Sequence, residues 1–343
     1  MAAVQPNQNQ LGGVVLVREH LLNLLSDGRF HSGQRLAHVL GVSRSAVWKQ
    51  IQRLESDLGL GIHAVRGRGY RLVAPLELLD GEKIRHEISA ASLAYLDTMS
   101  LLSTTQSTNA CGLKDPPGSS GRARVWLAEH QTGGRGRRGR RWVSSFGENL
   151  YVSLAWRFDL PMTELAGLSL AAGVVVAEAL GSLGLEGHSL KWPNDVVVDG
   201  RKLSGILLEV SGEADGPATA VLGIGVNFRV PQEHGAQIEQ PWTDLSQASR
   251  VPISRNRLAG VLIDQLILAC RLFSTDRLLP FLDRWEIFDG LGGQGVRILG
   301  GSQSIEGVYR GIAPSGAMVL EDSSGRRSEH HAGEVSLRRD ACT

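Results

Sequence analysis

The first apolar positions of the chain recur at helical spacing. Valines and leucines at 14, 17, 21, 24 and 25 share one face of a predicted helix that ends at Asp27-Gly28. Two further helices follow, with Ser32 and Ser43 as their N-caps and Gly41 as the stop between them. Helices joined by such a tight turn are typical of a helix-turn-helix. The polar residues 1–13 show no period, and we expect a loose tail there.

The last of these helices presents a face rich in hydrogen-bond donors, of the kind that reads base edges and holds phosphates. Its predicted DNA-contacting side chains are Arg44, Ser45, Trp48, Lys49, Gln52 and Arg53. A basic hairpin over 62–73, with Arg68 near its tip, is typical of a wing. Residues 14–75 carry nine Lys or Arg and four acidic residues, a net charge of +5 in a chain whose total is +1. This charge favours a DNA-binding winged helix over the other class that fits, a three-helix protein-interaction module.

Alternating apolar positions replace the helical period in the middle of the chain. Strands are predicted over 125–128, 196–198, 202–210 and 221–228, and Asp199-Gly200 indicates a two-residue hairpin. Helical spacing returns in a core helix that begins at a Thr163 cap and ends at Gly181, and again from Ser254 to Ala269. Together these elements predict a mixed-sheet α/β domain.

Two features of this middle part indicate contact with something else. Gly223 and Gly225 remove side chains from a strand, which is typical of a place where another group approaches the backbone. The polar segment 231–252 contains Trp242 amid loop residues and is interpreted as a lid.

Short strands separated by tight turns begin after Gly290. Those over 295–299, 305–312 and 318–321 predict a small all-β barrel. The chain is therefore predicted to be an α+β multidomain protein with boundaries at 14–75, 76–288 and 289–343.

Composition narrows the class of protein. A chain of 343 residues with 42% apolar content can bury two or three cores. It shows neither a secretory leader nor an apolar run of about 18 residues, so no membrane association and a cytoplasmic location are expected. Cys111, Cys270 and Cys342 have neither metal-ligand nor disulfide spacing.

The stretch from Ala128 to Trp142 carries candidate chemistry, because five arginines stand among four glycines. Glycines weaken helices and strands, and neighbouring guanidinium groups repel each other, so an anionic ligand is the natural reason for this pattern. Gly134, Gly136 and Gly139 also spell a dinucleotide-binding fingerprint, but turn residues and a strand follow where a helix is required. The other alternative is a disordered, RNA-binding or solvated segment, which the strands on both sides disfavour.

Polar residues elsewhere have two possible roles. Ser107 and Thr108 are able either to cap the helix that follows them or to bond the polar head of a ligand. Most lysines are solvated, but Lys202 begins an otherwise apolar strand, where a desolvated ammonium group needs an anionic partner.

Four motifs in register carry a resemblance to a known family. They are Gly134-Arg-Gly-Arg-Arg-Gly-Arg-Arg-Trp142, Lys191-Trp-Pro-Asn-Asp195, Arg201-Lys-Leu-Ser-Gly205 and Gly223-Ile-Gly-Val-Asn227. Together they resemble the biotin protein ligases. With a winged helix before them and a small barrel after them, residues 14–340 are similar to the bifunctional form that also represses the biotin operon. The resemblance implies a class II synthetase-like catalytic domain and an SH3-like C-terminal barrel.

The resemblance also implies roles for individual residues. Lys202 and Arg137 match clamps on the biotin carboxylate and the α-phosphate, Arg140 matches a phosphate contact, and Asp195 matches a catalytic polar position. The implied biotin and nucleotide contacts are Ser107, Thr108, Asn109, Gln131, Gly134, Arg135, Arg137, Trp142, Asn194, Lys202, Gly205, Gly223, Asn227 and Trp242. Gln106 stands where the family is expected to have an acidic or similar residue.

The implied reaction forms biotinoyl-5′-adenylate from biotin and ATP and then biotinylates a lysine of a biotin carboxyl carrier protein. ATP is expected to arrive with Mg²⁺, without a dedicated metal site on the protein. The adenylate is expected to promote homodimerisation on a two-fold operator DNA. A second class stays open, a ligand-sensing transcription regulator without ligase activity, although a sensor would not need the phosphate clamps.

Overall fold

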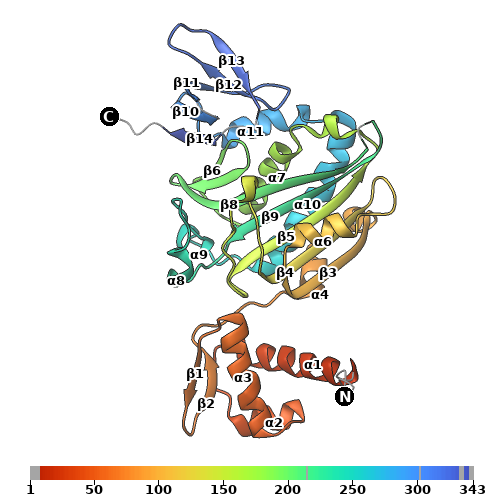
Figure 1. Ribbon diagram of the computed structural model, residues 1–343, viewed down its shortest axis with the longest axis vertical. Coiled ribbons are helices and arrows are strands. Elements are labelled where there is room, and N and C mark those ends of the chain that lie inside the picture. The colour runs from red at the N-terminus through yellow and green to blue at the C-terminus, as the bar shows by residue number, and fades with distance from the viewer. Residues whose placement is uncertain (1–7, 214, 301–302, 332–335, 340–343) are drawn as a thin grey trace, which may run out of the picture. The chain divides into compact units, whose positions relative to one another are not determined.

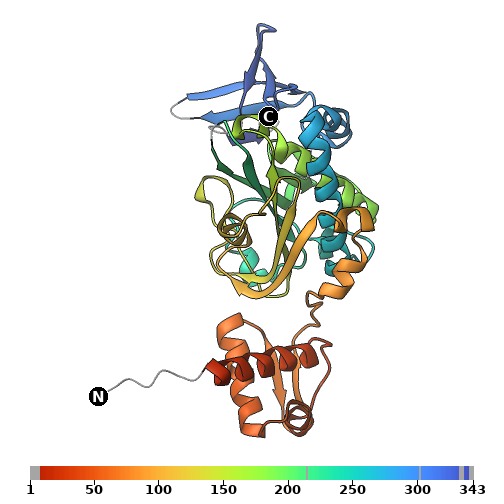
Figure 2. The same cartoon turned by 90° about the vertical axis from the view of Figure 1, so that its right-hand side faces the viewer.

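The computed structural model describes residues 8–213, 215–300, 303–331 and 336–339, and its chain divides into two compact units. The first unit comprises Met1–Leu78 together with Ser145–Gly147, and the second comprises Leu79–Ser144 and Glu148–Thr343. Figures 1 and 2 show the elements of each unit from two directions. Among the predicted thiols, Cys111 and Cys270 are free, whereas Cys342 lies outside the described residues.

Three helices and a β-hairpin form the first unit (Figure 1). They are α1 (Gln8–Leu25), α2 (Gly33–Leu40), α3 (Arg44–Leu58), β1 (Ile62–Val65) and β2 (Gly69–Leu72). Ser32 and Ser43 cap α2 and α3 by accepting from the backbone N–H of Arg35 and Ala46, as predicted. Gly41 ends α2 with a φ of 64°, which also confirms its predicted role.

The expectation of a loose tail over 1–13 is wrong from Gln8 onward, where α1 begins. Gln and Leu are good helix formers, and the helix continues through Gly12-Gly13 because its later turns are anchored. Leu21 and Leu25 of that helix are fully buried.

The wing packs back onto the helices through a short bridge. His31 and Tyr70 exchange backbone hydrogen bonds, both of 2.9 Å. Gly69 is required there, because a Cβ on it would lie 2.0 Å from the His31 carbonyl oxygen. The apolar core of this unit also contains Phe146, which comes from the distant tripeptide 145–147. The sequence pattern did not predict this contribution.

A seven-stranded mixed sheet organises the second unit, in the order β3-β4-β5-β9-β8-β7-β6. Only β3 and β4 pair in parallel, and the other neighbours are antiparallel. The strands are β3 (Leu96–Thr105), β4 (Ala123–Gln131), β5 (Asn149–Phe158), β6 (His188–Lys191), β7 (Asp195–Val198), β8 (Arg201–Gly212) and β9 (Ala218–Asn227). Asp199 and Gly200, with φ of 50° and 74°, make the predicted two-residue turn between β7 and β8.

Helices cover the two faces of this sheet unequally. The long helices α7 (Leu168–Ser182) and α10 (Arg255–Asp276) lie over one face, where they bury the main apolar core (Figures 1 and 2). The short helix α6 (Thr108–Lys114) packs on the other face, against Trp126, Ala155 and Val221. Because strand side chains alternate, the second face is free to carry polar residues.

The predicted start of the first long helix is wrong, and that of the second is confirmed. Thr163 lies in a 3₁₀ turn (Met162–Leu165), and α7 begins only after Gly167, whose φ of 84° interrupts the helix. A Cβ on Gly167 would also meet Leu278 at 2.8 Å. Ser254 does cap α10, which continues past the predicted Ala269 to Asp276.

The prediction that no segment is long and apolar enough to span a membrane is wrong, because both long helices have the length and hydropathy of a membrane span. The window within Met162–Ser182 is 67% buried inside the protein, and that within Arg255–Asp276 is 56% buried. Their apolar character is therefore accounted for by the core that they form with the sheet.

Smaller elements complete the second unit. They are α4 (Gly81–His86), α5 (Ala90–Leu93), α8 (Gln232–Gly235), α9 (Leu245–Ala248) and α11 (Leu282–Phe288), with 3₁₀ turns at Arg137–Gly139 and Leu279–Phe281. The segment interpreted as a lid, 231–252, thus contains two short helices, and Trp242 in it is half-buried.

The C-terminal strands form a separate five-stranded antiparallel sheet, in the order β13-β12-β11-β10-β14. They are β10 (Gly295–Gly300), β11 (Gln303–Ile312), β12 (Met318–Glu321), β13 (Arg327–His330) and β14 (Ser336–Arg339). The three predicted strands are confirmed, and two more follow them. The indole Nε1 of Trp192 donates to the Gly316 carbonyl oxygen at 3.3 Å, which joins this sheet to the Lys191–Asp195 motif.

A buried ion pair fixes the start of α10 against the central sheet. Arg255 is 1% exposed, and it donates to Glu129 Oε2 at 2.9 Å and to the Asn149 carbonyl oxygen at 2.8 Å. Glu129 in turn accepts from the backbone N–H of Leu79. The pair therefore joins α10, β4, β5 and the segment before α4.

We expect Arg255→Met to lower the free energy of unfolding of the second unit by about 3 kcal/mol, because it leaves the Glu129 carboxylate buried without its cation. Urea unfolding measures this change. The double variant Glu129→Leu/Arg255→Met should recover most of the loss, and Lys83→Met, which breaks an exposed pair with Asp80, should change little. Equal losses for the single and double variants would contradict this account.

Candidate active site

The candidate site lies on the face of the central sheet that the long helices leave open. Three glycines on β8 and β9 face it, since Gly205 pairs with Gly225 and Leu207 pairs with Gly223. A Cβ on Gly223 would lie 2.1 Å from Asn109 Oδ1, and one on Gly225 would lie 2.7 Å from the Trp142 ring. This confirms the predicted close approach to the strand and identifies the approaching groups as side chains of the protein itself.

The arginine-rich stretch folds as a narrow hairpin. Trp142 N–H donates to the Gly134 carbonyl oxygen at 2.9 Å, and Gly136 N–H donates to the Arg140 carbonyl oxygen at 2.7 Å. Arg135 bridges to Arg141 between these bonds, and a 3₁₀ turn over Arg137–Gly139 closes the tip. At that tip Arg138 has a positive φ of 58°. Because β5 and not a helix follows, the hairpin lacks the geometry of a dinucleotide-binding loop.

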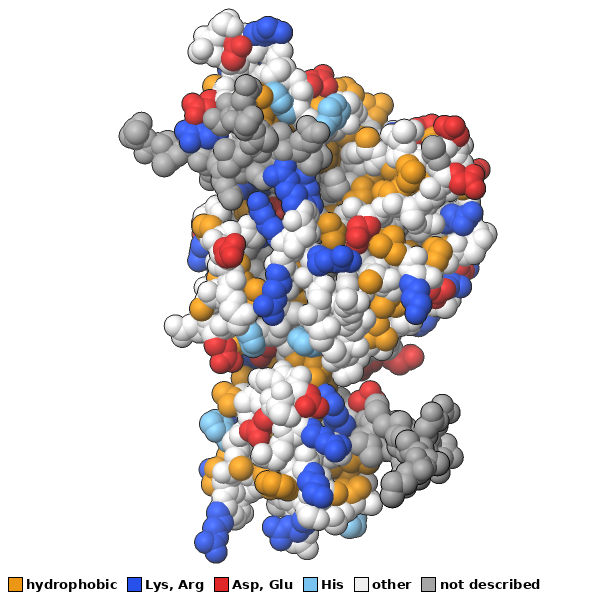
Figure 3. Space-filling model, viewed as in Figure 1, with side chains coloured by type: hydrophobic (Ala, Val, Ile, Leu, Met, Phe, Trp, Pro, Cys, Tyr) orange, Lys and Arg blue, Asp and Glu red, His pale blue; other side chains and the backbone are white. Residues whose placement is uncertain are grey.

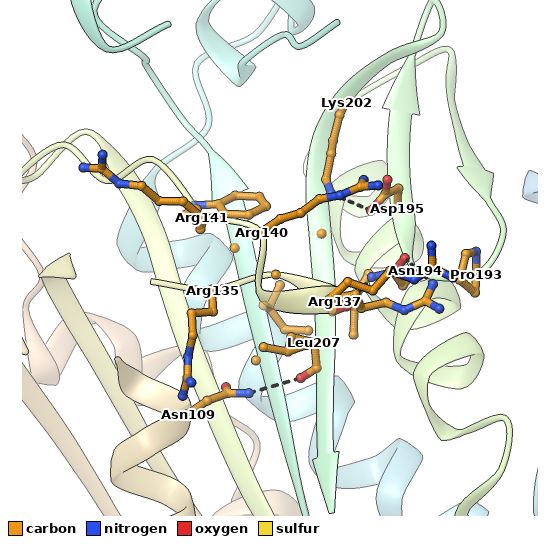
Figure 4. A pocket seen from close by; sticks show the side chains of 18 of the residues that line it. Asn109, Arg135, Arg137, Arg140, Arg141, Pro193, Asn194, Asp195, Lys202 and Leu207 are labelled. Carbon is orange, nitrogen blue, oxygen red and sulfur yellow. Dashed lines mark hydrogen bonds and ion pairs between the residues drawn. The ribbon is translucent and has the colours of Figure 1, made fainter. Parts of the chain in front are cut away.

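The hairpin, α6 and the ends of β7 and β8 enclose a pocket (Figure 4). Seven cationic side chains line it together with one carboxylate, that of Asp195. The cations are Arg135, Arg137, Arg138, Arg140, Arg141, Lys191 and Lys202. Such an excess of positive charge suits a ligand that brings several negative charges.

Lys202 and Asp195 form the ionic centre of the pocket. The ammonium Nζ lies 2.7 Å from Asp195 Oδ1, and both side chains are mostly buried, at 17% and 20% exposure. Lys202 Nζ also lies 5.4 Å from the centre of the Trp142 ring, which is within cation–π range. The predicted anionic partner of Lys202 is thus Asp195 within the protein, and Figure 4 shows the pair.

Arg137 reaches across the pocket to the Lys191–Asp195 motif. Its guanidinium donates to Asn194 Oδ1 at 3.5 Å, and Asn194 Nδ2 donates to the Ile206 carbonyl oxygen at 2.7 Å. Burial lowers the pKa of Arg137, the neighbouring Arg138 lowers it further, and Asp195 opposes them. Even so, a guanidinium keeps its charge at any physiological pH, so Arg137 remains a cation.

A second pocket adjoins the first and shares five of its residues, Arg140, Arg141, Trp142, Lys202 and Gln240. It extends to Asn227, Trp242 and the segment 237–240. Asn227 has a supporting contact there, since its Nδ2 donates to the carbonyl oxygen of Thr243 at 3.0 Å and of Lys202 at 3.4 Å. A ligand with two parts is therefore able to extend from one pocket into the other past Lys202.

The structure brings most of the sequence-predicted site residues together. Thirteen line the first pocket: Ser107, Thr108, Asn109, Gln131, Arg135, Arg137, Arg140, Trp142, Asn194, Asp195, Lys202, Gly205 and Gly223. Asn227 and Trp242 line the second pocket. Gly134 lines neither of them, and it lies at the base of the hairpin, where a Cβ would be 3.1 Å from Gln131 Nε2.

The alternative role of Ser107 and Thr108 as helix caps is not supported. Ser107 stands at the N-cap of α6, but its side chain makes no capping hydrogen bond. Instead, Gln131 Oε1 accepts from the backbone N–H of Thr108 at 2.8 Å and lies 3.1 Å from its hydroxyl. A side chain from β4 thus satisfies this N–H group, and Thr108 is left in the pocket wall.

Sequence reasoning missed three residues behind the pocket. Ser153 bonds to both Thr108 and Asn109, and Glu209 accepts from Asn109. Ser144 Oγ accepts from the backbone N–H of Gln131 at 2.9 Å. A signal for Ser153 was present, because it is the only hydroxyl in the buried apolar run Leu150–Trp156 apart from Tyr151.

The predicted DNA-contacting residues all lie at the surface of the first unit. Arg44, Ser45, Trp48, Lys49, Gln52, Arg53 and Arg68 are exposed. Trp48 is 52% exposed, which is unusual for so large an apolar side chain. The guanidinium of Arg68 lies 4.2 Å from the centre of the Phe30 ring, which supports the wing tip. Figure 3 shows Lys and Arg side chains (blue) at the surface of both units.

A winged helix and a cation-lined pocket on a mixed sheet define the class: a DNA-binding domain joined to a domain that binds an anionic ligand. Comparison with known proteins agrees. Residues 17–71 match a helix-turn-helix domain, 102–227 match the biotin/lipoate A/B protein ligase family, and 291–338 match the biotin protein ligase C-terminal domain.

Relatives match nearly the whole chain. It is 39% identical to the bifunctional ligase/repressor BirA of Escherichia coli, over 93% of this chain and 96% of the relative. It is 34% identical to BirA of Bacillus subtilis, over 92% of this chain and 97% of that relative. The solved biotin protein ligase of Aquifex aeolicus, in complex with biotin and ATP, is 29% identical with a TM-score of 0.57, over 71% of this chain and 99% of that one. The chain belongs to the biotin protein ligase family, in its bifunctional ligase/repressor form.

We expect biotin and ATP together to protect the hairpin 133–141 from trypsin, because ligand anions offset the repulsion among its arginines. Gel or mass-spectrometric analysis of limited digests measures the rate of cleavage there. Cleavage at Arg66 and Arg68 in the wing provides an internal control that the ligands should not change. Equal cleavage of the hairpin with and without ligands would contradict its ordering by the ligand.

Proposed function

We propose that this bifunctional biotin ligase and repressor uses its two adjoining pockets for the two halves of one adenylate. The observation that carries the proposal is the excess of cations around Lys202, at the place where the two pockets share residues. The biotin head would lie near Thr108 and Gln131, and the nucleotide would lie near Trp142 and Trp242. Lys202 would then stand between the biotin carboxylate and the α-phosphate.

The proposed chemistry brings two anions together. A carboxylate oxygen of biotin attacks the α-phosphorus of ATP, the bond to the β-phosphate oxygen breaks, and pyrophosphate leaves. Lys202, Arg137 and Arg140 offset the repulsion between carboxylate and phosphate and stabilise the charge that develops on the α-phosphate. Asp195 would hold Lys202 in place through their ion pair. The amine of a carrier-protein lysine then attacks the acyl carbon, loses a proton and releases AMP.

Mg²⁺ fits this site as a cation that the nucleotide brings with it. In the part of the chain that the structure describes, no group of three or more His, Cys, Asp or Glu side chains is placed to hold a metal ion. Asp195 lines the first pocket and Glu239 lines the second, and with only these carboxylates along the two pockets phosphate oxygens and water would supply most of the ligands. The ion would supply further neutralisation of phosphate charge.

The proposed partners follow from the two ends of the chain. Operator DNA would bind the exposed basic face of α3 and the wing, and the substrate would be a biotin carboxyl carrier protein. The loaded protein would act as a homodimer, because a two-fold operator presents two half-sites. We propose a cytoplasmic location and domains at 14–75, 76–288 and 289–343.

The runner-up function is a ligand-sensing regulator without ligase activity. A sensor of biotin has no use for cations at the position of the phosphates, whereas Arg137, Arg140 and Lys202 all line the first pocket. Release of pyrophosphate from ATP in the presence of biotin distinguishes the two functions, because only the ligase produces it.

We expect Lys202→Ala to lower the rate of adenylate formation by about a hundredfold to a thousandfold, the usual effect of removing one group that stabilises transition-state charge. Biotin-dependent release of pyrophosphate measures the rate. Thermal unfolding should stay close to wild type, since Lys202 contributes charge more than packing. Wild-type turnover by a folded Lys202→Ala protein would rule out its role as a clamp.

We expect biotin plus ATP to raise operator affinity, and the effect to grow with protein concentration, because dimerisation is linked to DNA binding. A titration of the chain's own upstream DNA at fixed salt measures it, since a basic domain binds any DNA at low ionic strength. Arg137→Gly should reduce the ligand-induced gain, and Lys49→Ala should weaken DNA binding while pyrophosphate release stays intact. Affinity that does not respond to the ligands would leave only the ligase function.

A further inference from the structure

A chain of polar side chains, buried except for the half-buried Glu209 at its end, runs behind the wall of the first pocket. It begins at Glu209 on β8, passes through Asn109 on α6 and Ser153 on β5, and ends at Thr108, which lines the pocket. Ser153 is fully buried, and Asn109 is 4% exposed. The mechanism proposed above uses neither Ser153 nor Glu209.

The orientation of the Asn109 amide is determined by its neighbours. One amide atom lies 2.8 Å from Glu209 Oε2 and 3.3 Å from the Leu207 carbonyl oxygen, and the second of these contacts is drawn in Figure 4. A carbonyl oxygen only accepts hydrogen bonds, so this atom must be the donor Nδ2. Asn109 Oδ1 therefore points to Ser153, whose Oγ lies 2.6 Å away.

This orientation decides where the hydroxyl protons go. Asn109 Oδ1 has no proton, so Ser153 donates its single proton to it. Thr108 Oγ1, 2.7 Å from Ser153 Oγ, is the second acceptor in reach of that one proton, and the contact with Asn109 holds the proton away from it. The Thr108 hydroxyl donates its own proton to Gln131 Oε1, 3.1 Å away within the protein. Thr108 Oγ1 thus keeps a lone pair to offer to the pocket.

We propose that Glu209, Asn109 and Ser153 form a hydrogen-bond relay that holds Thr108 as an acceptor, so that the site selects a ligand head group that donates an N–H at this point. The proposal rests on the proposed function, because it takes biotin as the ligand. The ureido ring of biotin carries two N–H donors, whereas the dithiolane ring of lipoate carries none. The matched family includes ligases for both acids, and the relay would separate one from the other.

Close packing leaves the relay little freedom to rearrange. Gly223 pairs with Ser153 on the neighbouring strand and lies directly against Asn109, where a Cβ would be 2.1 Å from Oδ1. Breaking the relay at Asn109 frees the Ser153 proton to turn fully to Thr108 Oγ1, which engages one of the two lone pairs of that oxygen and weakens it as an acceptor for the ligand. Ser153, Asn109 and Glu209 are thus positioning residues that act through Thr108.

The test measures the KM for biotin and for ATP in pyrophosphate release, together with the preference for biotin over lipoate in competition. We expect Ser153→Ala and Asn109→Leu to raise the KM for biotin roughly threefold to tenfold, the effect of one hydrogen bond. The KM for ATP should stay unchanged, and lipoate should compete better. Desthiobiotin, which keeps the ureido ring, should lose affinity by the same factor as biotin.

Variants of Glu209 and Asn109 test the direction of the relay. Glu209→Leu removes the acceptor for Asn109 and should raise the KM for biotin more than Glu209→Gln, which keeps an acceptor oxygen. Asn109→Asp places two carboxylates in contact and should be harmful, and adding Glu209→Gln should restore part of the loss by exchanging donor and acceptor. The exposed Ser211, on the same strand, provides the control variant Ser211→Ala.

The outcomes separate the relay from the proposed function. A wild-type protein that releases no pyrophosphate with biotin overturns the proposed function and the relay with it. If the wild-type protein does release pyrophosphate with biotin, the relay alone is overturned when Ser153→Ala, Asn109→Leu and Glu209→Leu all leave the KM for biotin and the competition by lipoate unchanged. A parallel rise in both KM values with a lower Tm also overturns it, because that pattern indicates general loss of structure. Glu209 is half-buried, so Glu209→Leu still tests the relay if the variants of the buried Ser153 and Asn109 fail to fold.

Discussion

Repulsion among cations is the constraint around which the catalytic unit is built. Seven Lys and Arg side chains share one pocket with the carboxylate of Asp195, and like charges held this close raise each other's energy. The protein offsets part of this cost within itself, through the 2.7 Å contact of Lys202 with Asp195 and the bond of Arg137 to Asn194. The remaining charge is available to ligand anions, which is the property an adenylate-forming site needs.

The backbone holds these charges in place without help from large side chains. The hairpin closes through backbone bonds at Gly134 and Gly136, and the strand beneath it is reduced to glycine at 223 and 225. The second of these glycines leaves room for the Trp142 ring, which in turn lies over the Lys202 ammonium group. Ligand recognition, charge placement and sheet packing therefore depend on the same few positions.

Polar interactions elsewhere in the second unit support this face of the sheet. The buried Arg255–Glu129 pair fixes the long helix α10 to the strands that carry Gln131 and Asn149. Trp192 connects the motif that contains Asp195 to the C-terminal sheet through its bond to Gly316. The C-terminal sheet is thus attached to the site through a residue of the site's own motif.

Local sequence determined the elements whose cause is local. The caps Ser32, Ser43 and Ser254, the stop at Gly41 and the Asp199-Gly200 turn all act within a few residues, and each was predicted from the sequence. The four motifs likewise identified the family and most of the pocket residues.

Tertiary structure decided what depends on distant partners. Gly167 interrupts the helix predicted from Thr163 where it packs against Leu278, and α1 extends to Gln8 because its later turns are anchored in a core. Thr108 bonds to Gln131 instead of capping its own helix, and Ser153 and Glu209 join it only because β5, β8 and α6 meet on one face. Hydrogen bonds between elements far apart in sequence leave no periodic signal, so a single sequence could indicate Ser153 only as an isolated hydroxyl in an apolar strand.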